Sequence, residues 1–481
     1  MTPVPKEFAD SLRAAIGGRA QDVLDALQSE ESVVGVRVNP AKMQPSSLAS
    51  RFGVGAQPVP WRQDAFFLDS RPVFALDPLF HAGAYYVQDP SAMFVGSVAD
   101  WLISASDAPL RILDLCAAPG GKSTCVAAAL RGGDVLVSNE VIGSRASVLA
   151  ENMVKWGSPN TVVTYNDPKD FAQLTARFDI ILADVPCSGE GMFRKDPEAL
   201  AQWSPDNVNL CAARQRRIVA DVWPALREGG WMLYSTCTFN SSENDGNVEW
   251  ICRELGAEVV TLCGEAELRK SRSIFLQAEY SATRRQKECG APEGGRFTAE
   301  GAVATKYGLQ LGMGLTRGEG QYVALLKKTS AQKAKPTPKA AKPARKASCS
   351  WLLQGFSAYE VATSAGTILK AYPEKIESDV LLFESALHAI RSGVAVAAVK
   401  GRDLIPQADL ALSQAFRRDA FPSVELAKDQ ALDFLRCAAL QLPDAPRGFV
   451  TVTCENLPLG FVKNLGSRAN NLFPQAWRLR M

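Results

Sequence analysis

Apolar and polar positions change their spacing repeatedly between about residues 111 and 255. Short β-rich apolar runs alternate there with longer segments whose apolar residues recur at helical spacing, a pattern typical of strands followed by helices. We predict strands at RILDLC (111–116), VLVSNE (135–140), TVVTYND (161–167), FDIILADVPC (178–187), WMLYSTC (231–237) and, after a glycine turn, GEGQYVALLKK (318–328). Helices are predicted from about Lys122 and over SRASVLAENMVKWG (144–157). The alternation predicts an α/β fold with a mostly parallel sheet and helices on both faces.

Polar or reactive side chains stand at the ends of these predicted strands. They are Asp114, Glu140, Asp167, Asp184, Cys187 and Cys237. In parallel sheets ligands bind at the carboxyl ends of the strands, so the six are candidates for one site. A helix cap explains any single acidic residue among them equally well. It does not explain all six together.

The stretch LDLCAAPGGKST (113–124) resembles a phosphate-binding P-loop only in its second half, because Cys116 occupies the position of the first glycine. Asp114, the turn with Gly120 and Gly121, and Glu140 after the next strand instead predict a site that holds a nucleoside by its ribose hydroxyls. The G-x-G-x-x-G of dinucleotide folds is absent. This favours an adenosyl cofactor without a pyrophosphate, such as S-adenosylmethionine.

A length of 481 residues is too great for one core and suggests about three domains. The segment KKTSAQKAKPTPKAAKPARK (327–346) carries eight basic residues and no acidic one, which predicts a flexible linker. Whether it is only a tether or also contacts phosphates stays open. Residues 256–313 are expected to form a long, partly exposed loop. The expected division is 1–95, 96–328, a linker at 329–348 and an α+β unit at 349–481.

Composition places few further limits on function. An apolar content of 47%, a charged content of 22% and the lack of a long apolar segment predict a cytosolic globular protein without a membrane partner. The net charge of +2 does not by itself indicate a nucleic-acid partner. Eleven cysteines without a C-x-x-C pair, and only two histidines, make a metal site improbable and predict reduced thiols.

Three motifs carry a family resemblance. DLCAAPGGKST (114–124), ADVPCSGEGMFRKDPE (183–198) and YSTCTFNSSEND (234–245) resemble those of the Nol/Nop/Sun family of RNA cytosine-C5 methyltransferases. VVGVRVNPAK (33–42) and GAYYVQDPSAM (83–93) resemble its N-terminal domain, and GEGMFRKDP with the C-terminal unit suggests the RsmF-type branch, which acts on 16S ribosomal RNA. The resemblance implies a Rossmann-like methyltransferase core between a small N-terminal α+β domain and a C-terminal PUA-like RNA-binding domain.

The resemblance implies methylation of carbon 5 of cytosine through a covalent cysteine adduct at carbon 6. Carbon 5 is a poor nucleophile, but a thiolate that adds at carbon 6 turns the ring into an enamine that can attack a methyl group. The family assigns the attack to Cys237 and product release to Cys187. DNA cytosine methyltransferases attack from a PC motif, so the residues alone leave the two roles interchangeable.

The resemblance also implies a site for S-adenosylmethionine. Its residues would be Cys116, Ala117, Ala118, Pro119, Gly120, Gly121, Lys122, Glu140, Asp167 and Asp184. Glu140 would bind the ribose and Asp167 the adenine amine. Asp184 would also lie at the cytosine edge, where a carboxylate can accept from the exocyclic amine.

Two alternatives remain at this point. One is a transfer-RNA methyltransferase with the same chemistry; the other is a non-catalytic ribosome-assembly protein, which the presence of both cysteines and all four acidic residues disfavours. Amino-group methyltransferases are disfavoured because DVPC (184–187) lacks their two prolines and aromatic residue. The family usually has a proline–histidine pair before its GEG turn, whereas this chain has LGMGLTRGEG (311–320), which puts an RNA contact there in doubt. We expect a monomer whose linker and C-terminal unit add RNA affinity rather than chemistry.

Overall fold

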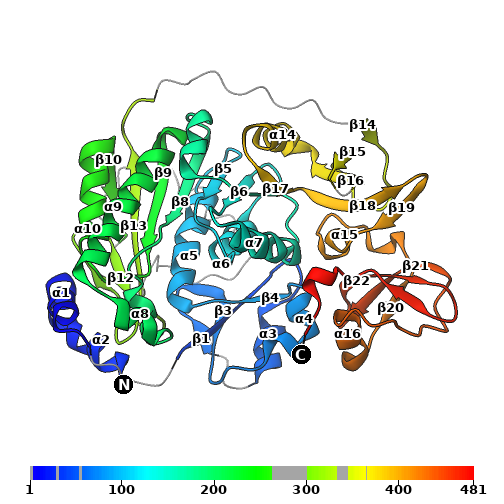
Figure 1. Ribbon diagram of the computed structural model, residues 1–481, viewed down its shortest axis with the longest axis horizontal. Coiled ribbons are helices and arrows are strands. Elements are labelled where there is room, and N and C mark those ends of the chain that lie inside the picture. Colours follow the sequence, from blue (N-terminus) through cyan, green and yellow to red (C-terminus); the bar gives the residue numbers. More distant parts are fainter. Residues whose placement is uncertain are drawn as a thin grey trace.

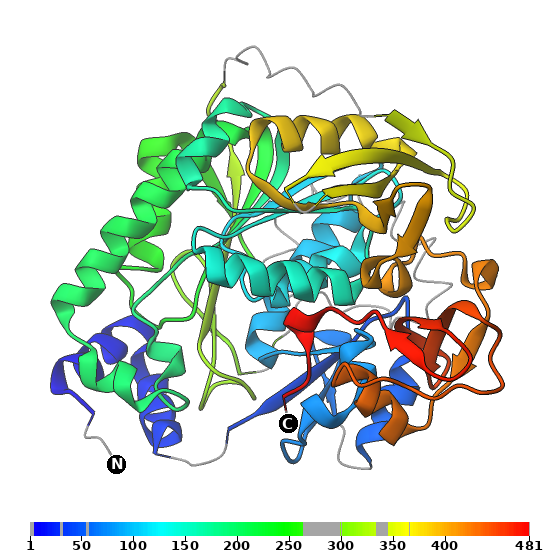
Figure 2. The ribbon, with the colours of Figure 1, turned by 45° about the vertical axis from the view of Figure 1, so that its right-hand side comes forward.

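The computed structural model describes residues 4–28, 32–53, 57–262, 299, 301–332, 345–364 and 366–480. A central sheet flanked by helices lies between a small N-terminal part and a C-terminal part that contains two further sheets (Figures 1 and 2). Residues 333–344 of the expected linker and residues 263–298 of the expected loop lie outside this description. In the part of the chain that is described, no helix has the length and apolar character needed to span a bilayer.

The central sheet has the strand order β11-β12-β13-β9-β8-β5-β6-β7-β17, with β10 paired to β13. Five neighbouring strands run parallel, as predicted: β9 (Leu226–Thr236), β8 (Phe178–Asp184), β5 (Arg111–Asp114), β6 (Val135–Asn139) and β7 (Thr161–Thr164). Antiparallel strands extend them on both sides: β13 (Gln321–Lys328), β12 (Leu309–Leu311), β11 (Val303–Ala304), β10 (Ala257–Val260) and, beyond β7, β17 (Ala389–Ser392). The sheet is therefore parallel at its centre and mixed as a whole.

Both faces of this sheet are covered, which explains the continuous apolar runs of its strands. Neighbouring side chains on β5 alternate between the faces: Ile112 joins one hydrophobic cluster and Leu113 the other. The first face is covered by α5 (Pro90–Ser104), α6 (Gly121–Ala129) and α7 (Gly143–Trp156). The second face is covered by α9 (Pro205–Val222), α10 (Asp245–Trp250) and α14 (Glu377–Ala386). The predicted Rossmann-like fold class is confirmed.

The N-terminal part has two pieces. Helices α1 (Lys6–Ile16) and α2 (Ala20–Leu27) pack against the region of α8 (Pro197–Gln202), where Phe8 meets the Trp203 ring edge-on. The second piece is a four-stranded sheet in the order β2 (Gln57–Val59), β3 (Arg62–Leu68), β1 (Val34–Val38) and β4 (Tyr85–Val87), accompanied by α3 (Pro45–Phe52) and α4 (Pro78–His81).

The C-terminal part contains two antiparallel-rich sheets (Figure 2). The first comprises β14 (Arg345–Ala347), β15 (Phe356–Thr363), β16 (Gly366–Pro373), β18 (Val394–Lys400) and β19 (Asp403–Pro406), with α15 (Ala408–Leu412) beside it. The second comprises β20 (Ser423–Glu425), β21 (Gly448–Cys454), β22 (Leu457–Asn464) and β23 (Ala469–Asn471), covered by α16 (Lys428–Leu435). Strand β14 takes up residues expected to belong to the linker.

This part does not stand apart from the central sheet, although the sequence pattern predicts a separate unit. The ring of Phe383 on α14 stacks on Phe178 of β8, with 5.5 Å between centroids. Asp379 of the same helix pairs with Arg111 of β5 at 2.9 Å. The second sheet shares a hydrophobic cluster with the N-terminal sheet, through Phe434 and Tyr85 among others. The C-terminal part is thus built into the core on two sides.

Candidate active site at the carboxyl ends of the strands

The loop between β5 and α6 has a fixed shape. Gly120 adopts a φ of +116°, and a Cβ there would lie 3.3 Å from the Leu149 side chain, so only glycine fits without strain. Helix α7 holds the outer side of the loop, because Arg145 and Asn152 donate hydrogen bonds to the carbonyls of Ala118 and Pro119. The loop is therefore shaped by the protein itself and has no need of a bound phosphate.

Asp114 lies beneath this loop, fully buried. Its Oδ2 accepts a hydrogen bond of 2.7 Å from Ser123, and its Oδ1 has no partner among the described residues. Burial raises the pKa of Asp114 to about 7. Burial also raises the pKa of the Cys116 thiol, as do the nearby carboxylates of Asp114, Asp184 and Glu140. Three of the predicted acidic residues therefore surround the end of β5.

Glu140 and Asp167 follow β6 and β7, and both accept main-chain hydrogen bonds from the turns after these strands. Glu140 Oε1 accepts from the main-chain N–H groups of Val141 and Ile142, just before α7, while Oε2 lies 3.4 Å from Arg145. Asp167 caps a short 3₁₀ helix, where it accepts from the N–H of Lys169, in line with the alternative interpretation of strand-end carboxylates. These hydrogen bonds hold each carboxylate in one orientation at the strand edge, which is also what recognition of a ligand requires.

Lys122 and Asp184 form an ion pair across the site. Lys122 Nζ lies 2.9 Å from Asp184 Oδ2, and the other oxygen, Oδ1, accepts 2.7 Å from Ser235 Oγ. Burial lowers the pKa of Lys122, but the Asp184 carboxylate more than offsets this and the net shift is upward. Gln321 of β13 also reaches Lys122 Nζ, at 3.4 Å. Lys122 is thus a charged group fixed between β5, β8 and β13 rather than a phosphate ligand.

Cys187 and Cys237 meet where β8 and β9 end. Their Sγ atoms lie 3.1 Å apart, well beyond the roughly 2.05 Å of a disulfide, and both thiols are free and half-buried. The hydrogen bond to Cys237, together with burial, raises the pKa of Cys187. The register of the two strands places Asp184 opposite Ser235, so the residues leading to each cysteine run side by side. Two sulfurs can therefore approach one small target from adjacent strands.

Two GEG turns hold the cysteine region by direct contact of glycine backbones. The N–H of Gly191 donates 2.8 Å to the carbonyl of Cys237, and the N–H of Gly320 donates 3.2 Å to the carbonyl of Gly191. A Cβ on Gly191 would lie 2.5 Å from Gly320 Cα and 2.7 Å from the Cys237 oxygen. No side chain fits there. The two turns therefore fix the main chain that carries Cys237.

A buried polar layer lies behind the cysteines, and none of its members was predicted from the sequence. Glu243 Oε2 accepts from the N–H of Ser188 at 3.0 Å and from Gln215 Nε2 at 2.7 Å. Glu190 accepts from Trp203 Nε1 at 2.9 Å and from the N–H of Phe239 at 3.1 Å. The only sequence signal is their place in or next to the motifs GEGMF and SSEND. These carboxylates tie the loop after β8 to the loop after β9.

Arg37 of β1 was also missed, and it connects the N-terminal sheet to the start of α6. It is fully buried, donates to Thr124 Oγ1 at 2.7 Å and lies over the Trp156 ring at 4.7 Å from the centroid. It also donates to the Gly121 carbonyl at 3.3 Å. An arginine inside an apolar strand pattern is the signal that could have found it, since such a charge needs several partners.

The segment LGMGLTRGEG, which departs from the family pattern, packs onto the N-terminal helices. Met313 is buried in their cluster, and Gly314, at a φ of +73°, leaves no room for a Cβ against the Asp22 carbonyl. Glu319 of the turn is buried and pairs with Arg194 at 2.8 Å. The turn therefore keeps its place without a proline–histidine pair.

Comparison with known proteins agrees with this architecture. Family models match residues 103–272 (16S rRNA methyltransferase RsmB/F), 4–90 (N-terminal domain of 16S rRNA methyltransferase RsmF) and 421–479 (methyltransferase RsmF PUA domain). The last match covers the second C-terminal sheet with α16, and the first C-terminal sheet lies outside it.

Curated relatives and solved structures extend the likeness. The ribosomal RNA small subunit methyltransferase F of Pectobacterium carotovorum is 30% identical over 98% of this chain and 95% of its own, and that of Escherichia coli O157:H7 is 31% identical over 92% and 89%. A methyltransferase homolog from Pyrococcus horikoshii shares the fold, with a TM-score of 0.51 and 22% identity over 67% of this chain and 95% of its own. The sites described above thus lie in a chain that belongs to the ribosomal RNA small subunit methyltransferase F family.

Proposed function

We propose that this protein methylates carbon 5 of a cytosine in 16S ribosomal RNA through a covalent adduct between Cys237 and carbon 6 of the base. The observation that carries the proposal is the pair of free thiols 3.1 Å apart, beside the Lys122–Asp184 ion pair. Family membership supports methyl transfer to ribosomal RNA. The choice of the ring carbon and the covalent step rest on the thiol pair.

S-adenosylmethionine is the cofactor, and it supplies an electrophilic methyl group. The loop from Cys116 to Lys122 would hold it, since Gly120 leaves a turn that no side chain fills. Glu140, already fixed by two main-chain N–H groups, would accept from the ribose hydroxyls. Asp167 would accept from the adenine amine. Asp184 would border both the cofactor and the cytosine.

The proposed reaction begins at Cys237. Its thiolate adds to carbon 6 of cytosine, the new S–C bond taking the place of the 5,6 double bond, and the ring electrons make carbon 5 nucleophilic. Carbon 5 would then take the methyl group as the bond between that group and the cofactor sulfur breaks, which leaves S-adenosylhomocysteine. A base takes the carbon-5 proton, the electrons of that C–H bond form the 5,6 double bond again, and Cys237 leaves as thiolate. The Cys237 thiolate is thereby regenerated.

Three neighbouring residues would assist the other steps of the proposed reaction. Asp184 would accept from the exocyclic amine of cytosine and so hold the base edge. The charge on the Cys237 sulfur is among the interactions that raise the pKa of Lys122, so this ammonium lies within electrostatic reach of the attacking atom. Cys187 would assist the elimination that releases the product, since its Sγ lies 3.1 Å from that of Cys237.

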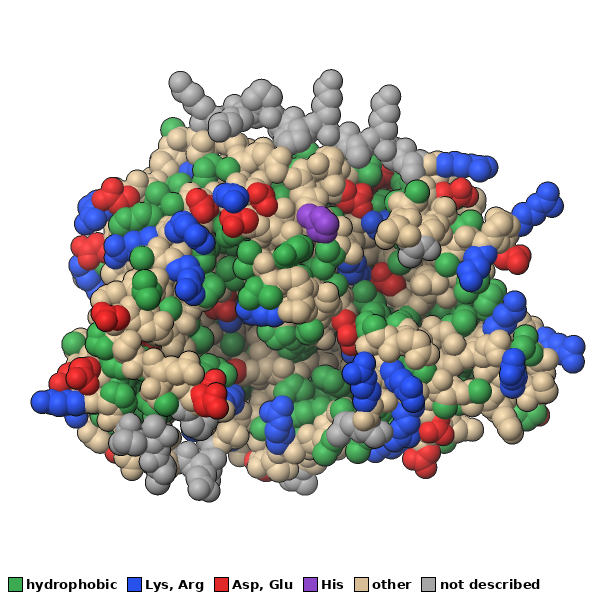
Figure 3. Space-filling view, viewed as in Figure 1, with side chains coloured by type: hydrophobic (Ala, Val, Ile, Leu, Met, Phe, Trp, Pro, Cys, Tyr) green, Lys and Arg blue, Asp and Glu red, His purple; other side chains and the backbone are tan. Residues whose placement is uncertain are grey.

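The proposed substrate sets the partner and the location. The molecular face in Figure 3 is hollowed near its middle, and basic, acidic and hydrophobic side chains all stand around the hollow. We place the protein on 16S ribosomal RNA or the small subunit, as a monomer in the cytoplasm. The match to a PUA domain at residues 421–479 supports RNA binding by the C-terminal part.

Incubation of the purified protein with S-adenosylmethionine and either 16S ribosomal RNA or transfer RNA, followed by bisulfite sequencing, tests this function. We expect protected cytosines in 16S RNA only. Protected cytosines in transfer RNA alone would show that transfer RNA, and not 16S ribosomal RNA, is the substrate. A protein that fails to bind S-adenosylmethionine by isothermal titration would instead be a non-catalytic binding protein.

A further inference from the structure

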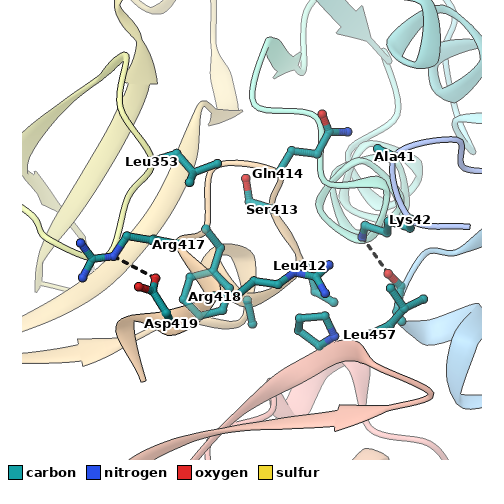
Figure 4. A pocket seen from close by; sticks show the side chains of 14 residues that line it. Ala41, Lys42, Leu353, Leu412, Ser413, Gln414, Arg417, Arg418, Asp419 and Leu457 are labelled. Carbon is teal, nitrogen blue, oxygen red and sulfur yellow. Dashed lines mark hydrogen bonds and ion pairs between the residues drawn. The ribbon is translucent and has the colours of Figure 1, made fainter. Parts of the chain in front are cut away.

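A hollow of about 530 Å³ lies where the N-terminal part and both C-terminal sheets meet (Figure 4). Its wall includes Lys42 after β1, the segment 411–419 that follows β19, and Leu457 with Pro458 at the start of β22. Three basic side chains and one acidic side chain line it: Lys42, Arg417, Arg418 and Asp419. None of them belongs to the active site described above.

The charges in this hollow are not balanced. Arg417 turns away in Figure 4 and pairs with Asp419 at 3.2 Å, which uses the one acidic group of the wall. Arg418 points toward Lys42 in the same view. Its Nη1 donates to the Asn456 carbonyl at 3.0 Å, and no ion pair joins it to any described carboxylate. Two basic groups thus face one another, and neither forms an ion pair with a described carboxylate.

Among the described residues, Lys42 donates side-chain hydrogen bonds only to main-chain oxygens. Its Nζ donates to the carbonyls of Ala82 at 2.7 Å and Lys155 at 2.6 Å, which leaves one N–H of the ammonium for another acceptor. The pKa of Lys42 is lowered to about 7, chiefly by burial and also by the positive charge of Arg418, while the Asp409 carboxylate acts in the opposite direction. Asp409 is itself engaged by Arg391 at 3.1 Å. An anion in the hollow would relieve the repulsion between the two cations.

We propose that this hollow is a phosphate-binding site, in which Arg418 and Lys42 hold one phosphate group between them. The volume admits a nucleotide, and a guanidinium with free N–H groups matches the geometry of phosphate oxygens. The RNA backbone is the favoured source of that phosphate, because the hollow joins the N-terminal part to the RsmF PUA match. This assignment of the source rests on the proposed RNA function; the phosphate site itself does not.

Charge reversal at Arg418 tests the site in the full-length protein. Arg418→Glu and Arg418→Ala are compared with Arg402→Glu and Arg402→Ala, which change an exposed arginine of the β18–β19 turn outside the hollow. Inorganic phosphate should raise the thermal midpoint of the wild type and of the Arg402 variants but not of Arg418→Glu. An equal response in all proteins would overturn the proposed site.

RNA binding distinguishes the two sources of phosphate. Arg418→Ala should weaken binding of 16S RNA severalfold and reduce the slope of log affinity against log salt by about one, while Arg402→Ala leaves both unchanged. If phosphate raises the thermal midpoint as expected but Arg418→Ala leaves RNA affinity unchanged, the RNA backbone is not the source of the phosphate. The site would then bind a free phosphorylated compound. Methyl transfer at saturating RNA, measured on the same proteins, reports separately on the proposed function.

Discussion

The main-chain N–H of His388 donates a hydrogen bond to Asn166 Oδ1, with 2.9 Å between the two atoms. The His388 carbonyl accepts in turn from the N–H of Tyr165 at 3.0 Å, just before β17 pairs with β7. Asn166 directly precedes Asp167, the residue proposed to bind adenine. A segment of the C-terminal part therefore clamps one loop of the proposed cofactor site.

This clamp predicts that cofactor affinity depends on the C-terminal part. His388→Pro removes the donating N–H, whereas His388→Ala removes the ring but keeps that N–H. Loss of one hydrogen bond corresponds to about 0.5 to 1.5 kcal/mol, so His388→Pro should bind S-adenosylmethionine about two- to tenfold more weakly in isothermal titration. His388→Ala should bind like the wild type. Equal cofactor affinities in the two variants would show that the hydrogen bond from His388 to Asn166 does not contribute to cofactor binding.

The expectation that the linker and the C-terminal unit add RNA affinity rather than chemistry stays a prediction, and a truncation near Lys328 does not test it cleanly. Truncation near Lys328 would remove α14 and β17 and uncover Phe178 of the central sheet, so it changes the core as well as the RNA-binding surface. Point variants in the complete chain are the sharper test of each contribution.

Glu140 should act on the cofactor alone. Loss of a charged hydrogen-bond partner corresponds to about 1.5 to 3 kcal/mol, so Glu140→Ala should lower cofactor affinity roughly tenfold to a hundredfold. Glu140→Gln is the matched control, since its amide oxygen can still accept from Val141 and Ile142 and keep the turn in place. Both are measured by titration with cofactor and, separately, with RNA. Normal cofactor binding with lost RNA binding in Glu140→Ala would contradict the assignment.

Glu243 should make the protein less stable as the pH rises. Burial raises its pKa to about 7, above the value of about 4.3 expected in the unfolded chain. The folded state therefore keeps a proton that the unfolded state has lost, and this group's contribution is largest below about pH 4.3 and declines up to about pH 7. The slope is about 1.4 kcal/mol per pH unit for one such group.

Glu243→Gln should reduce that slope, because glutamine carries no titrating proton and its oxygen can still accept from Ser188 and Gln215. Asp114, whose pKa is also raised to about 7, retains its own contribution in the variant. Urea unfolding between about pH 5 and about pH 8 measures the change. An unaltered slope would show that Glu243 does not keep its proton in the folded state.

The contact between the two GEG turns should be needed for the methylation rate but not for binding of the cofactor. A methyl group at residue 191 has no room beside Gly320 and the Cys237 carbonyl, so Gly191→Ala must displace the main chain that carries the sulfur. Misplacement by about 1 Å lowers a reaction rate on the order of a hundredfold. Cofactor affinity should stay unchanged, and Gly132→Ala, where a Cβ meets nothing within 4 Å, serves as the control. Full activity in Gly191→Ala would show that the turn does not position Cys237.

The centre of the fold could be predicted because each parallel strand is buried on both faces and leaves a clear apolar run. The end of each apolar run marks the end of a strand, and Asp184, Cys187 and Cys237 could be placed at these ends. Strand β17 could not be predicted, since Ala389–Ser392 is short and pairs with a strand more than two hundred residues earlier. Local pattern carries no information about such distant pairing.

The candidate residues at the strand ends could be read from the sequence, but the residues that support them could not. Motif positions identified the thiols and carboxylates that face the strand edge. Arg37, Gln215 and Glu243 form hydrogen bonds with residues that are distant in the sequence and meet only in the fold. The sequence around a single polar residue in a helix or strand does not show which partners it will have. The contact of Gly191 with Gly320 likewise joins two distant turns whose sequences show only that glycine is present.

The proposed mechanism depends on which cysteine attacks carbon 6 and which one assists the elimination. If Cys237 attacks carbon 6, Cys237→Ala can form no covalent adduct with RNA. If Cys187 assists elimination, Cys187→Ala should add, methylate and then stall with the protein still joined to RNA. The 3.1 Å separation of the two sulfurs lets each reach the same base. Cys252→Ala, on a half-buried thiol outside the site, is the matched control.

Denaturing gel electrophoresis of each variant after incubation with 16S RNA and S-adenosylmethionine is the most direct measurement. We expect a slower protein–RNA band for Cys187→Ala and no such band for Cys237→Ala. Cys252→Ala should methylate the RNA without accumulating the protein–RNA adduct. A band that forms with Cys237→Ala and vanishes with Cys187→Ala would reverse the roles of the two cysteines and contradict the proposed mechanism.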